Sequence, residues 1–283
     1  MSVLVFGKTG QVARELQARA PVVAIGRDEA DLSDPSACEA AVTAFSPSAV
    51  INAAAYTGVD KAEEDEELAT IVNGRAPTAI ARACKRLDIP FVQISSDYVF
   101  DGSGNQLWRP SDPPNPINAY GRSKLVGENG LTEAGGRFAV LRTSWVFSSR
   151  GHNFLKTMVR LSETRAELQV VNDQFGGPTP AAAIAEACLT IAQTLQWDAG
   201  KAGIYHFSGA PDVSWADFAR VIMAAVGKDV SIKGIPTSEY PTPAARPLNS
   251  RLDCSSTIET FNLTRPDWRK ATEEILDTLE IAP

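Results

Sequence analysis

The first half of the chain alternates short apolar runs with segments of helical periodicity. Five runs rich in Val, Ile, Ala and Phe are expected to be strands, at residues 3–6, 22–25, 49–52, 91–95 and 138–142. Between them, helices are expected at residues 11–20, 35–45, 63–87 and 119–131. Strands this short and apolar are typical of a parallel sheet covered by helices on both faces. The alternation therefore predicts an α/β fold, a Rossmann-type doubly wound parallel sheet.

After the fifth expected strand, the alternation of strands and helices becomes less regular. Helices are expected at residues 152–162, 181–195, 215–226 and 268–279, and a further strand at 204–208. Residues 236–247 contain four prolines and are expected to be largely loop. This pattern predicts a dinucleotide-binding domain over residues 1–150. Residues 151–283 are expected to form a smaller, mainly substrate-binding lobe, with some segments returning to the first domain.

Composition and charge exclude several classes of function. The net charge is −7, and hydrophobic residues make up 44% of the 283 residues, as in an ordinary globular protein. Nucleic-acid binding would need clustered Lys and Arg, so no nucleic-acid partner is expected. No stretch approaches the roughly 18 apolar residues of a membrane span, and the first apolar run is too short for a signal peptide. We therefore expect a cytoplasmic protein without a membrane partner.

The spacing of cysteines and histidines gives no support to a metal site. His152 and His206 are far apart and lack metal-ligand spacing. The cysteines have no CxxC spacing and are expected to be buried free thiols of a reducing compartment: Cys38, Cys84, Cys188 and Cys254.

A glycine-containing loop follows the first expected strand and opens the first helix. Gly7 allows a tight turn, and Gly10 lets the backbone approach a pyrophosphate at the helix N-terminus. Ala13 replaces the third glycine of the dinucleotide motif. A P-loop is disfavoured, because Lys8 precedes Gly10 and no GK[ST] follows. We expect this loop to bind a dinucleotide cofactor through Gly7, Thr9, Gly10, Gln11 and Val12.

The end of the second strand bears on the choice of cofactor. An acidic residue there usually receives the ribose hydroxyls of NAD, whereas an arginine suits the 2′-phosphate of NADP. Arg27 occupies this place and favours NADPH, while the neighbouring Asp28 and Glu29 leave NADH open. Asp31 and Leu32 are expected beside the adenine.

The residues with catalytic chemistry follow the fourth strand. Ser95 and Ser96 stand at its carboxyl end, where ligands of doubly wound sheets bind. Tyr120 and Lys124 are four residues apart and share one face of the next helix. Hydride addition to a carbonyl needs a proton donor; an ammonium beside a tyrosine is expected to lower the phenol pKa from near 10. The Ser96 hydroxyl would share the charge that grows on the oxygen.

This order of motifs resembles the extended branch of the short-chain dehydrogenase/reductase superfamily. Further segments resemble the dTDP-4-dehydrorhamnose reductase family, among them NAAAYTGVDKAE, SSDYVFDG, NPINAYGRSKLVGE, LRTSWVFSSRGHNFLKTM, VVNDQFGGPT and RPLNSRLD. The resemblance spans nearly the whole chain. It implies NAD(P)H-dependent reduction of the C4 ketone of dTDP-6-deoxy-L-lyxo-4-hexulose to dTDP-L-rhamnose, the last step of that pathway.

The same resemblance implies roles for individual residues. Tyr120 is the expected proton donor, Lys124 its partner, and Ser96 stands where many members have threonine. Cofactor contacts are implied for Gly10, Gln11, Val12, Asp31, Leu32, Ala53, Ala54, Ala55, Tyr120 and Lys124. Substrate contacts are implied for Thr57, Val59, Ser95, Ser96, Tyr120 and Trp145, with Asn153, Gln174 and Arg246 near the nucleotide part.

One departure from the family concerns magnesium. Some members form a dimer through a magnesium site of three glutamates, and Glu15 matches the first of these. The other two positions fall on Ala182 and Thr278, which have no carboxylate. A hard cation would lose most of its protein ligands. We therefore expect catalysis without a metal, in a monomer or a weak dimer that magnesium does not bridge.

Two other functions remain open at this point. An epimerase or 4,6-dehydratase of the same branch would also bind a nucleotide sugar, but dehydratases usually pair two acidic residues with the catalytic hydroxyl, and Asp97 is the one carboxylate beside Ser96. A non-catalytic regulatory subunit, such as the β subunit of methionine adenosyltransferase, also resembles this family. Consumption of NADPH would separate the reductase from both.

Overall fold

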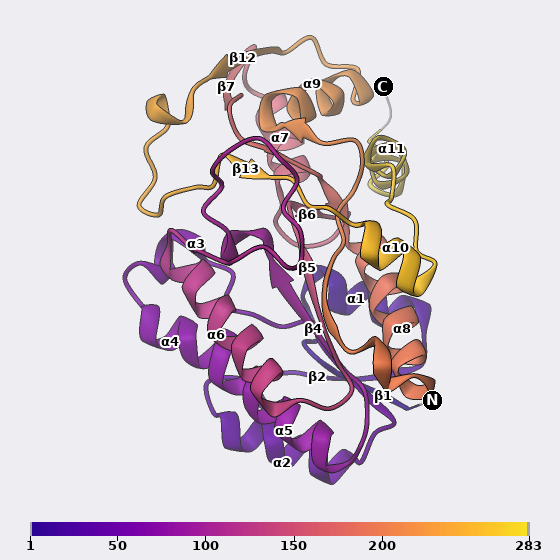
Figure 1. Cartoon of the computed structure of the whole chain (residues 1–283). Coiled ribbons are helices and arrows are strands. Elements are labelled where there is room, and N and C mark those ends of the chain that lie inside the picture. Colours follow the sequence, from indigo (N-terminus) through magenta and orange to yellow (C-terminus); the bar gives the residue numbers. More distant parts are fainter. Residues whose placement is uncertain (1, 282–283) are drawn as a thin grey trace.

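The computed structural model describes residues 2–281, which form a sheet lobe and a smaller lobe beside it (Figure 1). The sheet has six parallel strands in the order β10-β5-β4-β3-β1-β2. They are β1 Val3–Phe6, β2 Val22–Ile25, β3 Ala49–Asn52, β4 Phe91–Ser96, β5 Phe138–Thr143 and β10 Gly203–His206. The expected doubly wound α/β fold is thus confirmed, and one strand of the sheet comes from the second half of the chain.

Helices cover both faces of this sheet because its strands are apolar on both sides. Val3 and Val5 of β1 face one core, while Leu4 and Phe6 face the other. The first core lies under α1 Gln11–Arg19 and α8 Ala181–Trp197. The second lies under α2 Pro35–Phe45, α5 Ala76–Arg86 and α6 Ala119–Ala134.

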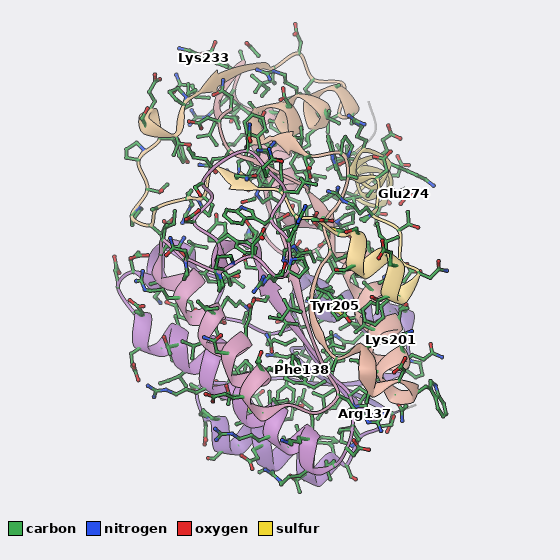
Figure 2. The ribbon with its side chains drawn as sticks, viewed as in Figure 1. Arg137, Phe138, Lys201, Tyr205, Lys233 and Glu274 are labelled. Atoms are coloured by element: carbon green, nitrogen blue, oxygen red, sulfur yellow. The ribbon has the colours of Figure 1, made fainter. Side chains whose placement is uncertain are left out.

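The smaller lobe has its own core between α7 Phe154–Ser162, α9 Trp215–Ala225 and α11 Trp268–Thr278. Figure 2 shows Lys233 and Glu274 on this lobe, and Phe138 and Tyr205 in the sheet lobe. The strands of the smaller lobe are short and were not expected from the sequence: β6 Val146–Phe147, β7 Glu167–Val171, β8 Phe175–Gly176, β9 Thr179–Pro180, β11 Val213–Ser214, β12 Ser231–Ile235 and β13 Asn249–Ser250. A further helix, α10 Ser255–Phe261, packs beside α8.

The expected helical region 63–87 differs from a single helix. The structure has α3 Val59–Ala62, α4 Glu66–Thr70, a π-helical turn Ile71–Arg75, and then α5. Within the turn, the buried Asn73 amide binds both backbone groups of Tyr56 and the hydroxyl of Ser123. A Cβ at Gly74 would lie 2.7 Å from the Val126 side chain. The π turn therefore holds the loop after β3 tightly against α6.

Among residues 2–281, every helix is too short or too polar to cross a bilayer.

Candidate active site

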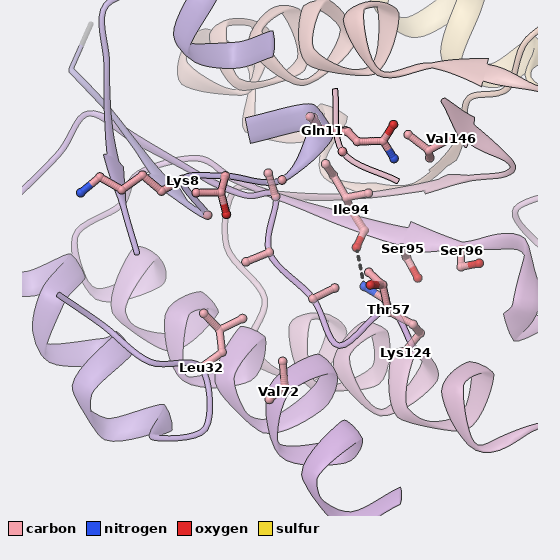
Figure 3. A pocket seen from close by; sticks show the side chains of 18 of the residues that line it. Lys8, Gln11, Leu32, Thr57, Val72, Ile94, Ser95, Ser96, Lys124 and Val146 are labelled. Atoms are coloured by element: carbon pink, nitrogen blue, oxygen red, sulfur yellow. Dashed lines mark hydrogen bonds between the residues drawn. The ribbon is translucent and has the colours of Figure 1, made fainter. Parts of the chain in front are cut away.

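A cavity of about 840 Å³ lies at the carboxyl ends of β1 to β5 (Figure 3). Its walls come from the loop between β1 and α1, the segments that follow β2 and β3, the end of β4 and the first turns of α6. Trp145, His152 and Trp215 close it from the side of the smaller lobe. In Figure 3, Lys8 and Leu32 lie toward one end of the cavity and Ser96 and Lys124 toward the other.

The loop between β1 and α1 is shaped to receive an anionic ligand. Gly7 has φ +109°, and a Cβ there would lie 3.2 Å from the backbone of Ala53. Gly10 is the N-cap residue of α1 and has no side chain that would occupy the first amides of the helix. These N–H groups and the positive end of the helix dipole suit a diphosphate. The residues present therefore fit a dinucleotide cofactor.

The end of β2 brings one cation and two carboxylates to the cavity, and Lys8 of the neighbouring loop adds a second cation. Arg27 lines it beside Asp28 and Glu29. The Lys8 side chain packs next to Gly26, and Lys8 Nζ lies 2.8 Å from Glu29 Oε1. The same carboxylate accepts a hydrogen bond from the Gly26 amide at 2.8 Å. The Glu29 charge is therefore already compensated by Lys8.

The segment after β3 contributes small side chains. Ala53, Ala54 and Ala55 line the cavity together with Thr57 and Val59. The Ala54 amide donates to Asn52 Oδ1 at 3.1 Å, and Asn52 in turn donates to Gln93 Oε1 at 2.9 Å. This buried amide pair fixes the path of the alanine segment along the cavity.

The start of α6 holds the catalytic pair. Asn118 caps the helix by accepting a hydrogen bond from the Gly121 amide at 2.8 Å. One turn apart on α6, Tyr120 and Lys124 both line the cavity. Lys124 Nζ donates to the carbonyl of Ile94 at 3.2 Å and lies 5.9 Å from the centre of the Tyr120 ring.

The electrostatics of this pair depart from the expectation for the phenol. Burial raises the pKa of Tyr120, the Asp97 carboxylate raises it further, and the Ser96 hydroxyl acts in the opposite direction. Burial also lowers the pKa of Lys124 to about 8, and the Glu128 carboxylate opposes that change. The pKa of the phenol is thus raised rather than lowered as the sequence suggested, because burial outweighs the ammonium of Lys124, which lies 5.9 Å from the ring centre. In this geometry Tyr120 holds its proton.

The two serines that end β4 have different partners. Ser96 Oγ donates to Asp97 Oδ1 at 3.0 Å and accepts from the Tyr98 amide at 3.2 Å. Ser95 Oγ donates to Glu128 Oε1 at 2.5 Å, away from Ser96. Burial raises the pKa of Asp97 to about 6.

Trp145 lies on the side of the cavity toward the smaller lobe. Its φ of 51° is in the left-handed region, and its ring stacks on Trp215 with centroids 3.6 Å apart and planes at 11°. Phe154 packs on the other side of Trp215 at 4.5 Å. A Cβ at Gly176 would lie 2.9 Å from the Trp145 ring, so a glycine is needed there. The wall is therefore a stack of aromatic rings from both lobes.

Three residues implied as nucleotide contacts lie outside the cavity wall. Asn153 caps α7 and donates to Gln11 Oε1 at 2.9 Å. Gln174 Nε2 donates to Thr237 Oγ1 at 3.1 Å. Arg246 Nη2 pairs with Asp60 at 2.8 Å. All other residues named for the cofactor or the substrate line the cavity, from Gly7 to Trp145.

Some wall residues were not identified from the sequence. Lys8 lies inside the glycine motif and Tyr98 directly follows Ser96 and Asp97, so adjacency to a motif was the available signal. His152 and Trp215 carry no such signal, because the folding of the smaller lobe brings them to the cavity. Further wall residues are Ile25, Gly26, Asp28, Glu29, Ala30, Val72, Ile94, Asp97, Thr143, Val146 and Gly151.

Within residues 2–281, no three His, Cys, Asp or Glu side chains gather in a way that would hold a metal ion. Glu15 instead forms an ion pair with Arg19 and lies 3.9 Å from Arg150. Ala182 is near the start of α8, and Thr278 ends α11.

Comparisons with known proteins show the family of this chain. A family model described as the RmlD substrate binding domain matches residues 1–281. The dTDP-4-dehydrorhamnose reductase of Burkholderia thailandensis is 45% identical over 96% of both chains. This chain belongs to the dTDP-4-dehydrorhamnose reductase family. It is therefore an oxidoreductase with a nicotinamide cofactor, and its substrate belongs to the nucleotide sugars.

Solved structures of the family have the same fold. The crystal structure of a dTDP-4-dehydrorhamnose reductase from Clostridium acetobutylicum is 34% identical, with a TM-score of 0.92 over 99% of this chain and 100% of that one. The Bacillus anthracis reductase, solved in complex with NADP, is 30% identical, with a TM-score of 0.91 over 98% and 99%.

Proposed function

We propose that this protein reduces the C4 ketone of dTDP-6-deoxy-L-lyxo-4-hexulose (dTDP-4-dehydrorhamnose) to give dTDP-L-rhamnose, the last step of dTDP-rhamnose biosynthesis, with NADPH as the preferred cofactor. The observation that carries the proposal is the meeting of Tyr120, Lys124 and Ser96 in one cavity beside a phosphate-binding loop. Relatives that share nearly the whole chain support the choice of substrate.

The chain's own residues account for the proton and the developing charge. When bound, the nicotinamide cofactor supplies a hydride to the carbonyl carbon. Tyr120 retains its proton in the buried site and donates it to the carbonyl oxygen as the C–O bond becomes single. Ser96 turns its hydroxyl from Asp97 to the same oxygen and shares the negative charge. Lys124, as an ammonium, stabilises the phenolate that remains on Tyr120.

The preference for NADPH rests on the cations at the end of β2. Arg27 lines the cavity where a ribose 2′-phosphate would lie, and Lys8 is beside it. The Lys8 contact removes the repulsion that Glu29 would exert on a phosphate. NADH remains usable, because Asp28 and Glu29 are placed to receive ribose hydroxyls. Gly7, Thr9, Gly10, Gln11, Val12, Asp31, Leu32 and the three alanines after β3 complete the proposed cofactor site.

The proposed substrate site lies between Ser96 and the aromatic wall. Trp145 offers an apolar face to the deoxysugar, with Thr57, Val59 and Ser95 around it. Arg246 is proposed to meet the diphosphate: within residues 2–281, its Nη1 is buried without a hydrogen-bond partner, while Nη2 holds Asp60. Asn153 and Gln174 remain proposed contacts of the nucleotide part.

A coupled assay tests this function. The 4-keto-L-sugar nucleotide is made in situ, protein and NADPH are added, and the product is identified by NMR. Stoichiometric oxidation of NADPH with formation of dTDP-L-rhamnose is the expected result. Conversion without loss of NADPH would indicate an epimerase instead. Absence of turnover together with a stoichiometric synthetase in a pull-down would indicate a regulatory subunit.

The setting of the activity is also part of the proposal. The four cysteines are buried and unpaired, as suits a reducing cytoplasm. We propose a monomer or weak dimer that needs no metal, since Glu15 is engaged by Arg19.

A further inference from the structure

Three ionisable side chains without a role in the proposed reaction lie buried behind the catalytic end of the cavity. They are Glu128 of α6, Arg142 of β5 and His206 of β10, each at most 2% exposed. Arg142 Nη2 donates to Glu128 Oε2 at 2.6 Å, and Arg142 Nε donates to both carboxylate oxygens at 3.0 and 3.1 Å. A buried ion pair often adds nothing to stability over apolar side chains of similar volume. Stability is therefore a weak explanation for this pair.

The carboxylate of this pair binds Ser95, which is the neighbour of the catalytic Ser96. Glu128 lies four residues after Lys124 on α6, so both project from one helix face. Ser95 Oγ donates to Glu128 Oε1 at 2.5 Å. Ser95 follows Ile94, whose carbonyl accepts the hydrogen bond of Lys124. Glu128 thus holds the strand end that carries both the acceptor of Lys124 and the proposed oxygen-binding Ser96.

Other charged groups around α6 are placed differently. Asp97 and Tyr98, in the turn after β4, face Tyr120. Glu63 accepts from the Ala119 amide at the helix start, and Glu66 of α4 pairs with Arg122 on the exposed side. The charged residues of the π turn and α5 are exposed: Arg75, Arg82, Lys85 and Arg86. Within residues 2–281, Glu128 is the carboxylate that acts on the charge of Lys124.

On the side away from Glu128, Arg142 is linked through His206 to the connection between β4 and α6. Arg142 Nη1 donates to His206 Nε2 at 3.3 Å, so the proton of the ring is on Nδ1, which donates to the Trp108 carbonyl at 3.0 Å. Burial and Arg142 lower the pKa of His206 to about 3, and the ring is neutral. The charges of the cluster are therefore those of Glu128 and Arg142 alone.

We propose that Glu128, held in place by Arg142, is a positioning residue whose carboxylate keeps the buried Lys124 charged and fixes the end of β4 through Ser95. The kinetic consequence rests on the proposed function, while the effect on Lys124 does not. Without a proton on Lys124, the phenolate that the reaction leaves on Tyr120 loses its stabilising positive charge.

The test is the pH dependence of kcat for Glu128→Gln. Burial already lowers the pKa of Lys124 to about 8, and the Glu128 charge opposes this. Removing that charge lowers the pKa further, so Lys124 loses its proton at lower pH. The alkaline limb of kcat is expected to move to lower pH by about 1 unit. A limb that coincides with that of the wild type would overturn the proposal.

Glu66→Gln is the matched control. It removes a carboxylate that grips Arg122 of the same helix at 2.7 and 2.8 Å, on the exposed side. Its pH profile is expected to match the wild type; an equal shift there would show that any lost ion pair of α6 has the same effect and would refute a special role of Glu128. If Glu128→Gln fails to fold because Arg142 is left unpaired, the double variant Glu128→Gln/Arg142→Gln removes both charges and is expected to give a smaller shift in the same direction; a limb that coincides with that of the wild type would overturn the proposal.

A second measurement needs no turnover. The affinity for NADP⁺, followed by calorimetry from pH 6 to 10, is expected to begin to weaken at a lower pH in Glu128→Gln than in the wild type, since the family resemblance implies that Lys124 contacts the cofactor. A shifted binding profile in a protein that does not reduce the sugar nucleotide would support the role of Glu128 and refute the proposed function. Identical binding profiles for the folded variant and the wild type would overturn the role of Glu128.

Discussion

The two ends of the cavity use charge in opposite ways. At the end near β2, Lys8 and Glu29 pair in the open, with side chains 52% and 40% exposed. At the end near α6, Lys124 and Asp97 are at most 4% exposed, and burial lowers the pKa of Lys124 to about 8 and raises that of Asp97 to about 6. Water screens the first pair of charges, so Lys8 and Glu29 interact only weakly. The second set is unscreened, so small changes there alter protonation.

This difference indicates which end of the cavity controls the reaction. Substitution of an exposed cation changes the free energy little, so exposed cations are suited to a modest preference for one cofactor over another. Buried groups depend on one another: Ser96 is held by Asp97, and Lys124 by the Ile94 carbonyl. We therefore expect large effects of substitution at the α6 end and small ones at the β2 end.

The largest effect is expected for Tyr120→Phe. The ring and its edge-to-face contact with Tyr98 remain, but the proton donor is lost. We expect kcat to fall about 10²- to 10⁴-fold with unchanged circular dichroism. Tyr240→Phe, at an exposed position, is the control. Activity retained in Tyr120→Phe would refute the mechanism.

Ser96→Ala is expected to have the next largest effect. It removes the hydroxyl that would bind the carbonyl oxygen, and kcat should fall about 10²-fold. Ser96→Thr keeps the hydroxyl and should retain most of the activity. Equal losses in both variants would mean that packing at the end of β4, rather than the hydroxyl, matters.

The β2 end is tested by Arg27→Ala. Loss of the guanidinium should lower kcat/KM for NADPH about tenfold relative to NADH, because a charge-assisted hydrogen bond to the 2′-phosphate is lost. Lys8→Ala should act in the same direction but less, as its charge is exposed and already paired. Lys201→Ala, in the turn before β10 and remote from the cavity, is the control. An unchanged NADPH/NADH ratio in Arg27→Ala would remove Arg27 from the proposed cofactor site.

A smaller effect is expected for Trp215→Leu, which leaves Trp145 without its stacking partner. The KM for the nucleotide sugar should rise about 3- to 10-fold, since an aromatic pair contributes about 0.5–1.5 kcal/mol, while the KM for NADPH stays constant. Trp197→Leu, at the exposed end of α8, is the control. A change in both KM values would place Trp215 in the packing of the lobes rather than in the sugar site.

The sequence predicts the two ends of the cavity unequally well. Local rules suffice for the sheet and for Gly7, Gly10, Ser96, Tyr120 and Lys124, because each of these residues lies within a few positions of a strand end or a helix start that the local pattern predicts. Trp215 could not be found in this way. Its place depends on the stack with Trp145, whose positive φ is set by the fold and not by its neighbours in sequence.

The protonation of the catalytic residues also could not be predicted from the sequence. The spacing of Tyr120 and Lys124 suggested a phenol of lowered pKa, but spacing says nothing about burial. In the structure burial of the phenol, and then the Asp97 carboxylate, raise the pKa of Tyr120 although Lys124 lies over the ring. The pairing of Glu128 with Arg142 also depends on tertiary structure, because α6 must pack on β5 before the two side chains meet.

The smallest effect is expected for removal of divalent metal. Glu15 of α1 is paired with Arg19, and Ala182 and Thr278 have no carboxylate to join it. A cation that needs several oxygen ligands gains little from one paired glutamate. We expect EDTA to leave both the reduction rate and the mass measured by light scattering unchanged, and added Mg²⁺ to have no effect. A dimer that dissociates in EDTA would contradict this and would require carboxylates from elsewhere on the surface.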